Sequence, residues 1–200
     1  MTIQYYFGLT SPYSFMGHER LYDIAAKHGA DVALRPVRMG DVMAVSGGVP
    51  VKQRAAQRQA YRLVELARWR KHLGMEFHLE PAHFPAPDGD AALRVIAADA
   101  LGLPAQKLAL AYMRAVWVEQ RNIGDAATVD AIVKEVGESE GFDAQAVIAR
   151  AVGPETTGAY DRYTEEAISA QVFGAPTYLY QGEMFWGQDR LDFLEQALRG

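Results

Sequence analysis

Short runs of apolar side chains lie near both ends of the chain and predict β-strands. Residues 3–7 are β-branched and aromatic, and residues 31–36 form a second short run. Between them, Ser11 followed by Pro12 predicts a helix start, because serine caps free N–H groups and proline fits a first turn. A helix over residues 12–27 completes a βαβ unit. We therefore expect the two strands to be parallel.

The middle of the chain has helical periodicity and almost no strand pattern. A long helix is predicted over residues 51–73, and a loop with Pro81, Pro85 and Pro87 follows it. Glycines separate the segments beyond this loop. Further helices are expected near residues 90–101, 105–121, 126–137, 143–151 and 155–171.

The strand pattern returns near the end of the chain. Residues 176–180 and 183–186 predict a hairpin around Gln181–Gly182. Asp189 predicts the N-cap of a final helix over residues 189–198. The element order is βαβ, a helical block, then ββα, so we expect both ends to share one sheet. This order divides the chain into a discontinuous α/β domain, residues 1–40 and 172–200, and an inserted helical domain, residues 41–171.

Composition narrows the class of protein. Half of the 200 residues are apolar, which excludes a disordered chain. The chain has no cysteine, which excludes a disulfide framework, a dithiol oxidoreductase and a cysteine zinc site. The five histidines lack a zinc-binding spacing, so we expect no metal. A net charge of −5 argues against nucleic acid as a partner.

The sequence also bears on location. The N-terminal residues lack a basic segment followed by a long apolar run, so a signal peptide is not expected. No apolar run approaches the roughly 20 residues of a membrane helix. We therefore expect a cytoplasmic protein with no membrane contact.

Three segments carry a resemblance to a known family. Residues 6–15 read Tyr-Phe-Gly-Leu-Thr-Ser-Pro-Tyr-Ser-Phe, and residues 182–191 read Gly-Glu-Met-Phe-Trp-Gly-Gln-Asp-Arg-Leu after Val-Phe-Gly-Ala-Pro-Thr at 172–177. Arg68-Trp69 and residues 81–85 match the middle of the same pattern. Together they resemble the 2-hydroxychromene-2-carboxylate isomerases, which are relatives of the kappa-class glutathione transferases within the DsbA-like group. The resemblance covers nearly the whole chain.

This resemblance implies a thioredoxin-like fold with a large all-helical insertion, and glutathione as the cofactor. Ser11 then stands where redox relatives carry a cysteine, and glutathione supplies the sulfur. Ala175 is expected to offer backbone hydrogen bonds to glutathione, beside a cis Pro176. The family's remaining glutathione contacts match Trp186, Gly187, Gln188 and Asp189.

The resemblance also implies an aromatic carboxylate substrate and allows a homodimer. Phe84 and Pro85 match residues that line the family's substrate pocket. Lys52 and Gln53 occupy the region where relatives often carry an asparagine, and Gly8 stands where many carry an aspartate. The cations available for the substrate carboxylate are Lys52, Arg54, Arg58 and Arg62; the three arginines recur every four residues, which is also typical of a solvated helix face.

The chemistry that suits these residues is stabilisation of a glutathione thiolate. A helix N-terminus carries partial positive charge, and a hydroxyl from Ser11 would add a hydrogen bond to the sulfur. The family reaction is a cis–trans isomerisation, in which the thiolate adds to a conjugated carbon and leaves after rotation. Ser11 would form no covalent bond.

Simpler roles and other functions remain open from the sequence. The sequence is also compatible with Ser11 and Asp189 as helix caps only, and with Trp186 as a packing residue. We consider a glutathione-dependent isomerase acting in the breakdown of aromatic compounds, a kappa-type transferase that releases a glutathione adduct, and a non-catalytic thioredoxin-like module that binds peptides beside Pro176.

Overall fold

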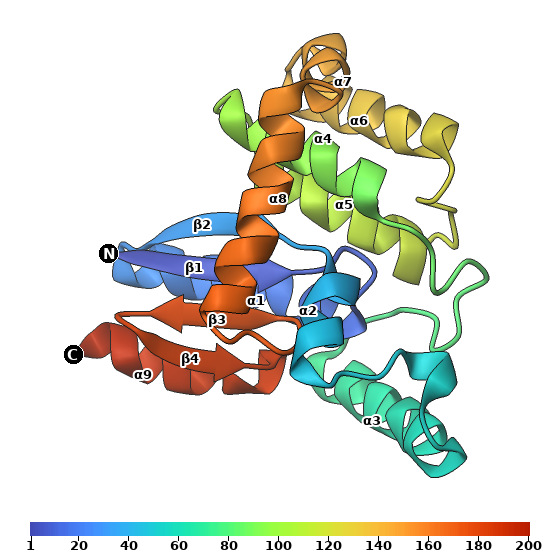
Figure 1. Ribbon diagram of the computed structural model, residues 1–200, viewed down its shortest axis with the longest axis vertical. Coiled ribbons are helices and arrows are strands. Elements are labelled where there is room, and N and C mark those ends of the chain that lie inside the picture. The colour runs from blue at the N-terminus through green and yellow to red at the C-terminus, as the bar shows by residue number, and fades with distance from the viewer.

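A four-stranded sheet forms the centre of the computed structural model, which describes all 200 residues (Figure 1). Its strands lie in the order β2-β1-β3-β4. The strands are β1 (Thr2–Phe7), β2 (Asp31–Pro36), β3 (Thr177–Tyr180) and β4 (Glu183–Trp186). β1 pairs in parallel with β2, and antiparallel pairs join β1 to β3 and β3 to β4. The predicted thioredoxin-like sheet, built from both ends of the chain, is confirmed.

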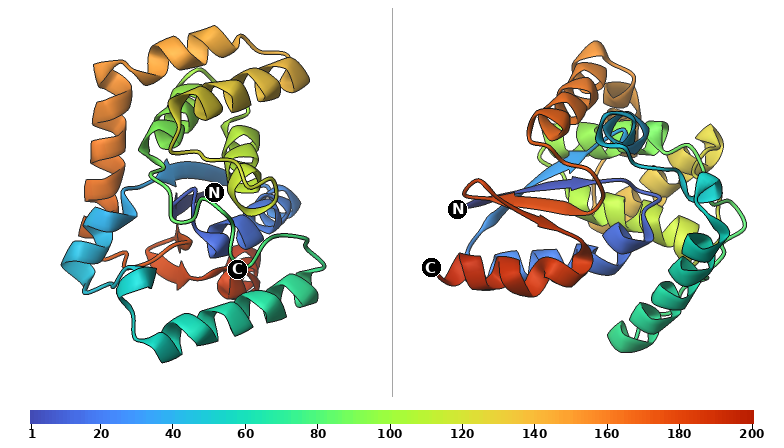
Figure 2. Two further views of the ribbon diagram at one scale, coloured as in Figure 1. Left: turned by 90° about the vertical axis from the view of Figure 1, so that its right-hand side faces the viewer. Right: turned by 60° about the horizontal axis from the view of Figure 1, so that its bottom comes forward.

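Alternate side chains of β1 face two different layers, as a buried strand with period 2 requires. Tyr5 belongs to the main core, whereas Tyr6 packs in a smaller cluster with Ala167 and Val172. The helices α1 (Pro12–His28) and α9 (Leu191–Arg199) lie together on one face of the sheet, and α8 (Pro154–Ser169) crosses the other (Figures 1 and 2).

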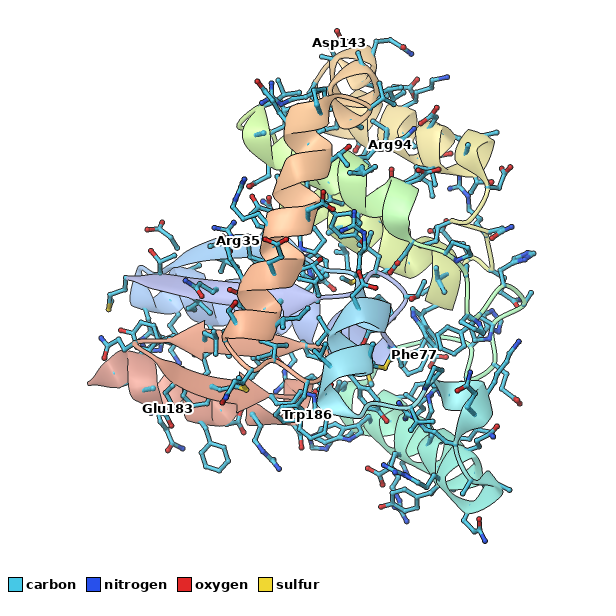
Figure 3. All side chains as sticks on the ribbon, in the orientation of Figure 1. Arg35, Phe77, Arg94, Asp143, Glu183 and Trp186 are labelled. Atoms are coloured by element: carbon cyan, nitrogen blue, oxygen red, sulfur yellow. The ribbon has the colours of Figure 1, made fainter.

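The helical block extends beyond the β2 edge of the sheet. It contains α4 (Gly89–Ala100), α5 (Ala105–Trp117), α6 (Ala126–Glu140) and α7 (Ala144–Ala151), and α8 connects it back to the sheet. Arg94 of α4 is buried and donates from Nη2 to Asp130 Oδ1 of α6 at 2.9 Å (Figure 3). None of the helices combines the length and apolar character that a membrane crossing requires.

One continuous apolar core joins the sheet to the helical block. A single cluster of 40 buried residues includes Tyr5 of β1, Leu21 of α1, Trp117 of α5 and Val133 of α6. The predicted domain boundaries, after residues 40 and 171, stay a prediction, and the core runs across them.

The segment between β2 and α4 differs most from expectation. An unpredicted helix, α2 (Met39–Ser46), follows β2. The single helix predicted over 51–73 is wrong at its start, because a 3₁₀ turn, η1 (Val51–Gln53), is followed by extended backbone at Arg54 (ψ 154°) before α3 (Ala56–Leu73) begins. α3 stands apart from the sheet, and Leu66 is its only buried residue (Figure 1).

The prediction that Asp189 caps the last helix is wrong. A second 3₁₀ turn, η2 (Gln188–Arg190), precedes α9, whose N-cap position is Arg190. Asp189 lies inside that turn, and its Oδ2 pairs with Arg190 Nη1 at 2.9 Å. Gly187 enters the turn with φ 104°, a conformation that glycine adopts without a steric penalty.

Candidate active site

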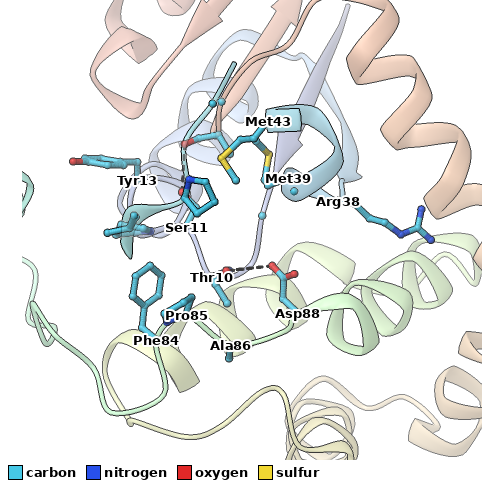
Figure 4. A pocket seen from close by; sticks show the side chains of 18 of the residues that line it. Thr10, Ser11, Tyr13, Arg38, Met39, Met43, Phe84, Pro85, Ala86 and Asp88 are labelled. Atoms are coloured by element: carbon cyan, nitrogen blue, oxygen red, sulfur yellow. Dashed lines mark hydrogen bonds between the residues drawn. The ribbon is translucent and has the colours of Figure 1, made fainter. Parts of the chain in front are cut away.

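A cavity of about 820 Å³ opens where the N-terminus of α1 meets the loop before β3 (Figure 4). The segment from α2 to α3 and the loop before α4 form its other walls. Its volume falls in the range of small-molecule sites. Seven of the residues predicted for the site line it: Ser11, Lys52, Gln53, Phe84, Pro85, Ala175 and Trp186.

Ser11 lies at the junction between β1 and α1. As predicted, it caps α1: its Oγ accepts the Ser14 N–H at 3.2 Å. The same hydroxyl donates to the carbonyl oxygen of Ala175 at 3.3 Å. Ser11 therefore joins the helix N-terminus to the loop before β3, two segments that are 164 residues apart in the chain.

The Ala175–Pro176 peptide bond is cis, as expected. The Ala175 N–H has no backbone hydrogen-bond partner in the chain. The Pro176 carbonyl accepts the Gly187 N–H at 2.9 Å, which ties this loop to the end of β4. Pro176 and Gly187 thus shape the wall without lining the cavity.

Two half-exposed aromatic rings flank this loop. The rings of Phe173 and Trp186 lie with centroids 4.7 Å apart, and 50% of Trp186 is exposed (Figure 3). A Cβ atom on Gly174 would collide with the Trp186 indole. Glycine at position 174 therefore lets the indole lie directly over the loop.

The structure places the next two residues of the tail outside the cavity. Gln188 is buried, and its Oε1 accepts from Arg20 Nη1 at 2.7 Å. Asp189 is exposed and paired with Arg190. Neither side chain is among those that line the cavity.

The opposite wall carries the cations. Lys52 and Arg54 line it, and Arg54 Nε donates to the Val49 carbonyl at 2.7 Å. Arg62 reaches the cavity from α3, whereas Arg58 does not line it. The expectation that the three arginines share one helix face is wrong, because Arg54 lies in the extended segment before α3.

Phe84 and Pro85 form the floor of the cavity below Ser11 (Figure 4). The Phe84–Pro85 bond is a second cis peptide bond, for which the sequence carries no signal. The Phe84 ring packs against Trp117, with centroids 5.1 Å apart. This contact fixes an aromatic surface inside the cavity.

Asp88 lines the cavity, although no pattern in the sequence marks it as a site residue. Its Oδ2 accepts the Thr10 N–H at 3.3 Å and the Thr10 hydroxyl at 3.4 Å (Figure 4). Burial raises the pKa of the Asp88 carboxyl, although the bonds from Thr10 lower it in part. A Cβ on Gly8 would lie 3.7 Å from that oxygen. Asp88 thus brings a carboxyl group close to Gly8, the position at which the family resemblance implies an aspartate.

The unpredicted helix α2 also contributes to the site. Met39 and Met43 project from it into the cavity opposite Pro85 (Figure 4). Next to them, Arg38 Nη1 pairs with Asp161 at 2.6 Å. Methionine side chains adapt to irregular apolar surfaces, so this wall suits a flat organic ligand. The sequence pattern did not indicate α2, so it also gave no indication that Met39 and Met43 line the cavity.

The model of the DSBA-like thioredoxin domain matches residues 2–199 of the chain. The chain is 30% identical to a 2-hydroxychromene-2-carboxylate isomerase from Pseudomonas putida, over 99% of this chain and 94% of that protein. It is 28% identical to one from Sphingobium xenophagum, over 98% and 97%. It is also 25% identical to human glutathione S-transferase kappa 1, over 98% and 90%.

Solved structures agree with these sequence matches. A 2-hydroxychromene-2-carboxylate isomerase aligns with a TM-score of 0.73 and 28% identity, covering 100% of this chain and 95% of that one. The cytosolic disulfide reductase DsbM from Pseudomonas aeruginosa, solved with glutathione, aligns with a TM-score of 0.69, covering 100% of both chains. At 22% identity, this second likeness supports the fold alone.

Proposed function

Because the chain belongs to the family of DSBA-like thioredoxin domains, and three curated relatives are 2-hydroxychromene-2-carboxylate isomerases, we propose that it is a glutathione-dependent isomerase. Its substrate would be an aromatic chromene or α-keto carboxylate. When bound, glutathione supplies a thiolate that can add reversibly to a conjugated double bond and allow rotation about it. A chain without cysteine has no sulfur nucleophile of its own.

The observation that carries this proposal is the position of Ser11. Its hydroxyl lies at the N-terminus of α1, in the wall of the cavity, and contacts the loop that ends in cis Pro176. We propose that this hydroxyl donates to a bound sulfur in place of the Ala175 carbonyl. A helix N-terminus favours an anion by about 0.3–2 kcal/mol. A hydrogen bond to a charged group adds roughly 1.5–3 kcal/mol.

The wall beside Ser11 fits the peptide part of glutathione. Ala175 lines the cavity and its N–H has no backbone hydrogen-bond partner, so it is available as a donor. Trp186 offers an exposed apolar surface next to it. We propose that Pro176, Gly187 and Gln188 hold this wall in shape, and that Asp189, exposed beyond it, receives the γ-glutamyl amine.

We assign the substrate to the other side of the cavity. Phe84 and Pro85 present the aromatic floor, and Lys52 and Gln53 lie at the rim with exposed side chains. A ring stacked on Phe84 would lie close to Ser11, which stands above that floor (Figure 4). The acid and the sulfur would then share one cavity.

The test is glutathione binding and thiol ionisation in Ser11→Ala. We expect the pKa of the bound thiol, followed by ultraviolet absorbance, to lie below the free value of about 8.5 in the wild type. Removing the hydroxyl should raise it by roughly one to two units, because a charge-assisted hydrogen bond is lost. Calorimetry at pH 7 gives the affinity in parallel.

Ser14→Ala is the matched control, since Ser14 lies in the same helix, is buried and does not line the cavity. The pKa of the glutathione thiol bound to Ser14→Ala should equal that of the thiol bound to the wild type. If wild-type protein binds no glutathione at millimolar concentration, the proposed function is wrong, and the loop beside Pro176 is better interpreted as a peptide or small-acid site.

The similarity to human glutathione S-transferase kappa 1 supports a second candidate, a transferase of that type. The two reactions use the same glutathione site and differ in whether the sulfur leaves again. Turnover of 2-hydroxychromene-2-carboxylate without net glutathione consumption would favour the isomerase. Accumulation of a stable glutathione adduct would favour the transferase.

A further inference from the structure

Arg62 places a charged nitrogen in the cavity wall without a partner. Its Nη2 atom is buried and makes no hydrogen bond. No Asp or Glu carboxylate lies within ion-pair distance of its guanidinium, whereas Arg94, for example, pairs with Asp130 at 2.9 Å. The guanidinium carbon lies 5.0 Å from the centre of the Phe84 ring and 5.9 Å from that of Trp117. Two aromatic rings therefore lie near the charge, and its buried Nη2 has no hydrogen-bond partner in the protein.

The other arginines with buried nitrogens in this protein each have a carboxylate partner. Arg94 donates to Asp130 from both Nε and Nη2. Arg35 and Arg150 each have one buried nitrogen without a hydrogen bond, but each pairs with a glutamate, Glu166 at 3.6 Å and Glu155 at 3.2 Å. Because buried polar groups in folded proteins are nearly always paired, the unpaired buried Nη2 of Arg62 in a cavity wall indicates a place for an anionic ligand.

We infer that Arg62 binds the carboxylate of an aromatic acid whose ring lies against Phe84. This assignment rests on the proposed function for the class of ligand and adds the residue that recognises its charge. Guanidinium groups match carboxylates with two parallel hydrogen bonds, and they stack on aromatic faces. Arg62 is already stacked on Phe84, so the ring and the carboxylate of one ligand would meet both groups together.

The charges around the cavity determine how such an acid is oriented in it. Lys52 and Arg54 line the same wall as Arg62 and add positive potential there. Asp88 lies at the other end of the loop that carries Phe84 (Figure 4). A carboxylate is attracted to the first region and repelled from the second. The acid therefore points its carboxylate toward α3.

A purely structural role for Arg62 is the main alternative. α3 has a single buried residue, and stacking of Arg62 on Phe84 and Trp117 also attaches this helix to the body of the protein. A tether would act equally on charged and uncharged ligands. A carboxylate ligand would act on the charged one alone, so a matched pair of ligands separates the two roles.

The experiment measures binding of 2-naphthoate and of its uncharged analogue 2-naphthamide to the whole protein by calorimetry. The variants are Arg62→Met, which removes the charge, and Arg62→Lys, which keeps it. Arg58→Met is the matched control, one helical turn earlier on α3 and outside the cavity lining. Glutathione affinity is measured for every variant.

We expect Arg62→Met to weaken 2-naphthoate binding by about tenfold to a hundredfold, in line with loss of a charged hydrogen bond. Its 2-naphthamide and glutathione affinities should stay within about twofold of wild type. Arg62→Lys should retain part of the preference for the acid, and Arg58→Met all of it. These readouts need no turnover, so they stand even if the isomerase activity is absent.

Three results would overturn the inference. Wild-type protein that binds neither ligand, or binds the acid and the amide equally, has no carboxylate site here. Parallel loss of both ligands in Arg62→Met would make Arg62 a tether of α3. Loss of glutathione binding in that variant would assign its guanidinium to a glutathione carboxylate instead.

Discussion

At the scale of single residues, burial decides how side chains behave that look ordinary in the sequence. Ser11 was predicted from its neighbours along the chain, since a serine before a proline marks a helix start. Asp88 and Arg62 carry no such local signal. Their properties come from Thr10, Phe84 and other residues far away in the chain.

His18 shows the same effect and gives a pH dependence. It is buried, its Nε2 lies 2.9 Å from the Gln106 carbonyl oxygen, and burial lowers its pKa to about 4. Between pH 6.5 and about 4 the unfolded chain binds a proton at this residue and the folded chain does not. Stability should therefore fall on acidification through this window, by about 3 kcal/mol in total.

Denaturant unfolding at a series of pH values measures how the free energy of unfolding changes with pH. His18→Gln should lose most of the slope between pH 6.5 and 4, whatever its stability at pH 7. His72→Gln, at an exposed position, should keep the slope of the wild type. An unchanged slope in His18→Gln would assign the acid sensitivity to other groups.

At the scale of elements, regular periodicity was a reliable guide where a helix or strand buries a whole face. The strands of the sheet and the helices α4 to α8 were predicted close to their observed bounds. The segment from α2 to α3 was not, because α2 buries only Val42 and α3 only Leu66. With so little burial, the apolar pattern that predicts a helix boundary is weak.

The weak attachment of α3 leads to a prediction about Leu66. Leu66→Ala leaves a cavity under the helix and should lower the free energy that holds α3 on the protein by about 2–5 kcal/mol. Hydrogen exchange should show faster opening of α3 amides than of α5 amides. Val64→Ala, which changes an exposed position of the same helix, should leave both measurements near wild type. If α3 and α5 amides were equally protected from hydrogen exchange in Leu66→Ala, α3 would not be weakly attached.

At the scale of the whole molecule, one core spans the sheet and the helical block. Arg94 and Asp130 add a paired charge inside that block, and α8 connects it to the sheet. The helical block therefore shares its core with the sheet, and its stability depends on that of the sheet.

We expect a single cooperative unfolding transition in urea. Far-ultraviolet circular dichroism reports on the helices, and tryptophan fluorescence reports on Trp69 of α3, Trp117 in the core and Trp186 at the end of β4. Coincident midpoints for the two signals are the expected result for a chain with one shared core. Two separated transitions would show that the helical block unfolds on its own.

The amino-acid sequence by itself determined the order of the elements, the parallel pairing of β1 with β2, the β3–β4 hairpin, and the serine at the start of the first helix. These depend on contacts within a few residues and on periodic burial, which a linear pattern records. Only the tertiary structure decided which wall each cation joins, where the α2 methionines point and why Asp88 and Arg62 line the cavity with partly buried side chains. Those features arise from segments that meet through the fold, and no spacing along the chain encodes their distances.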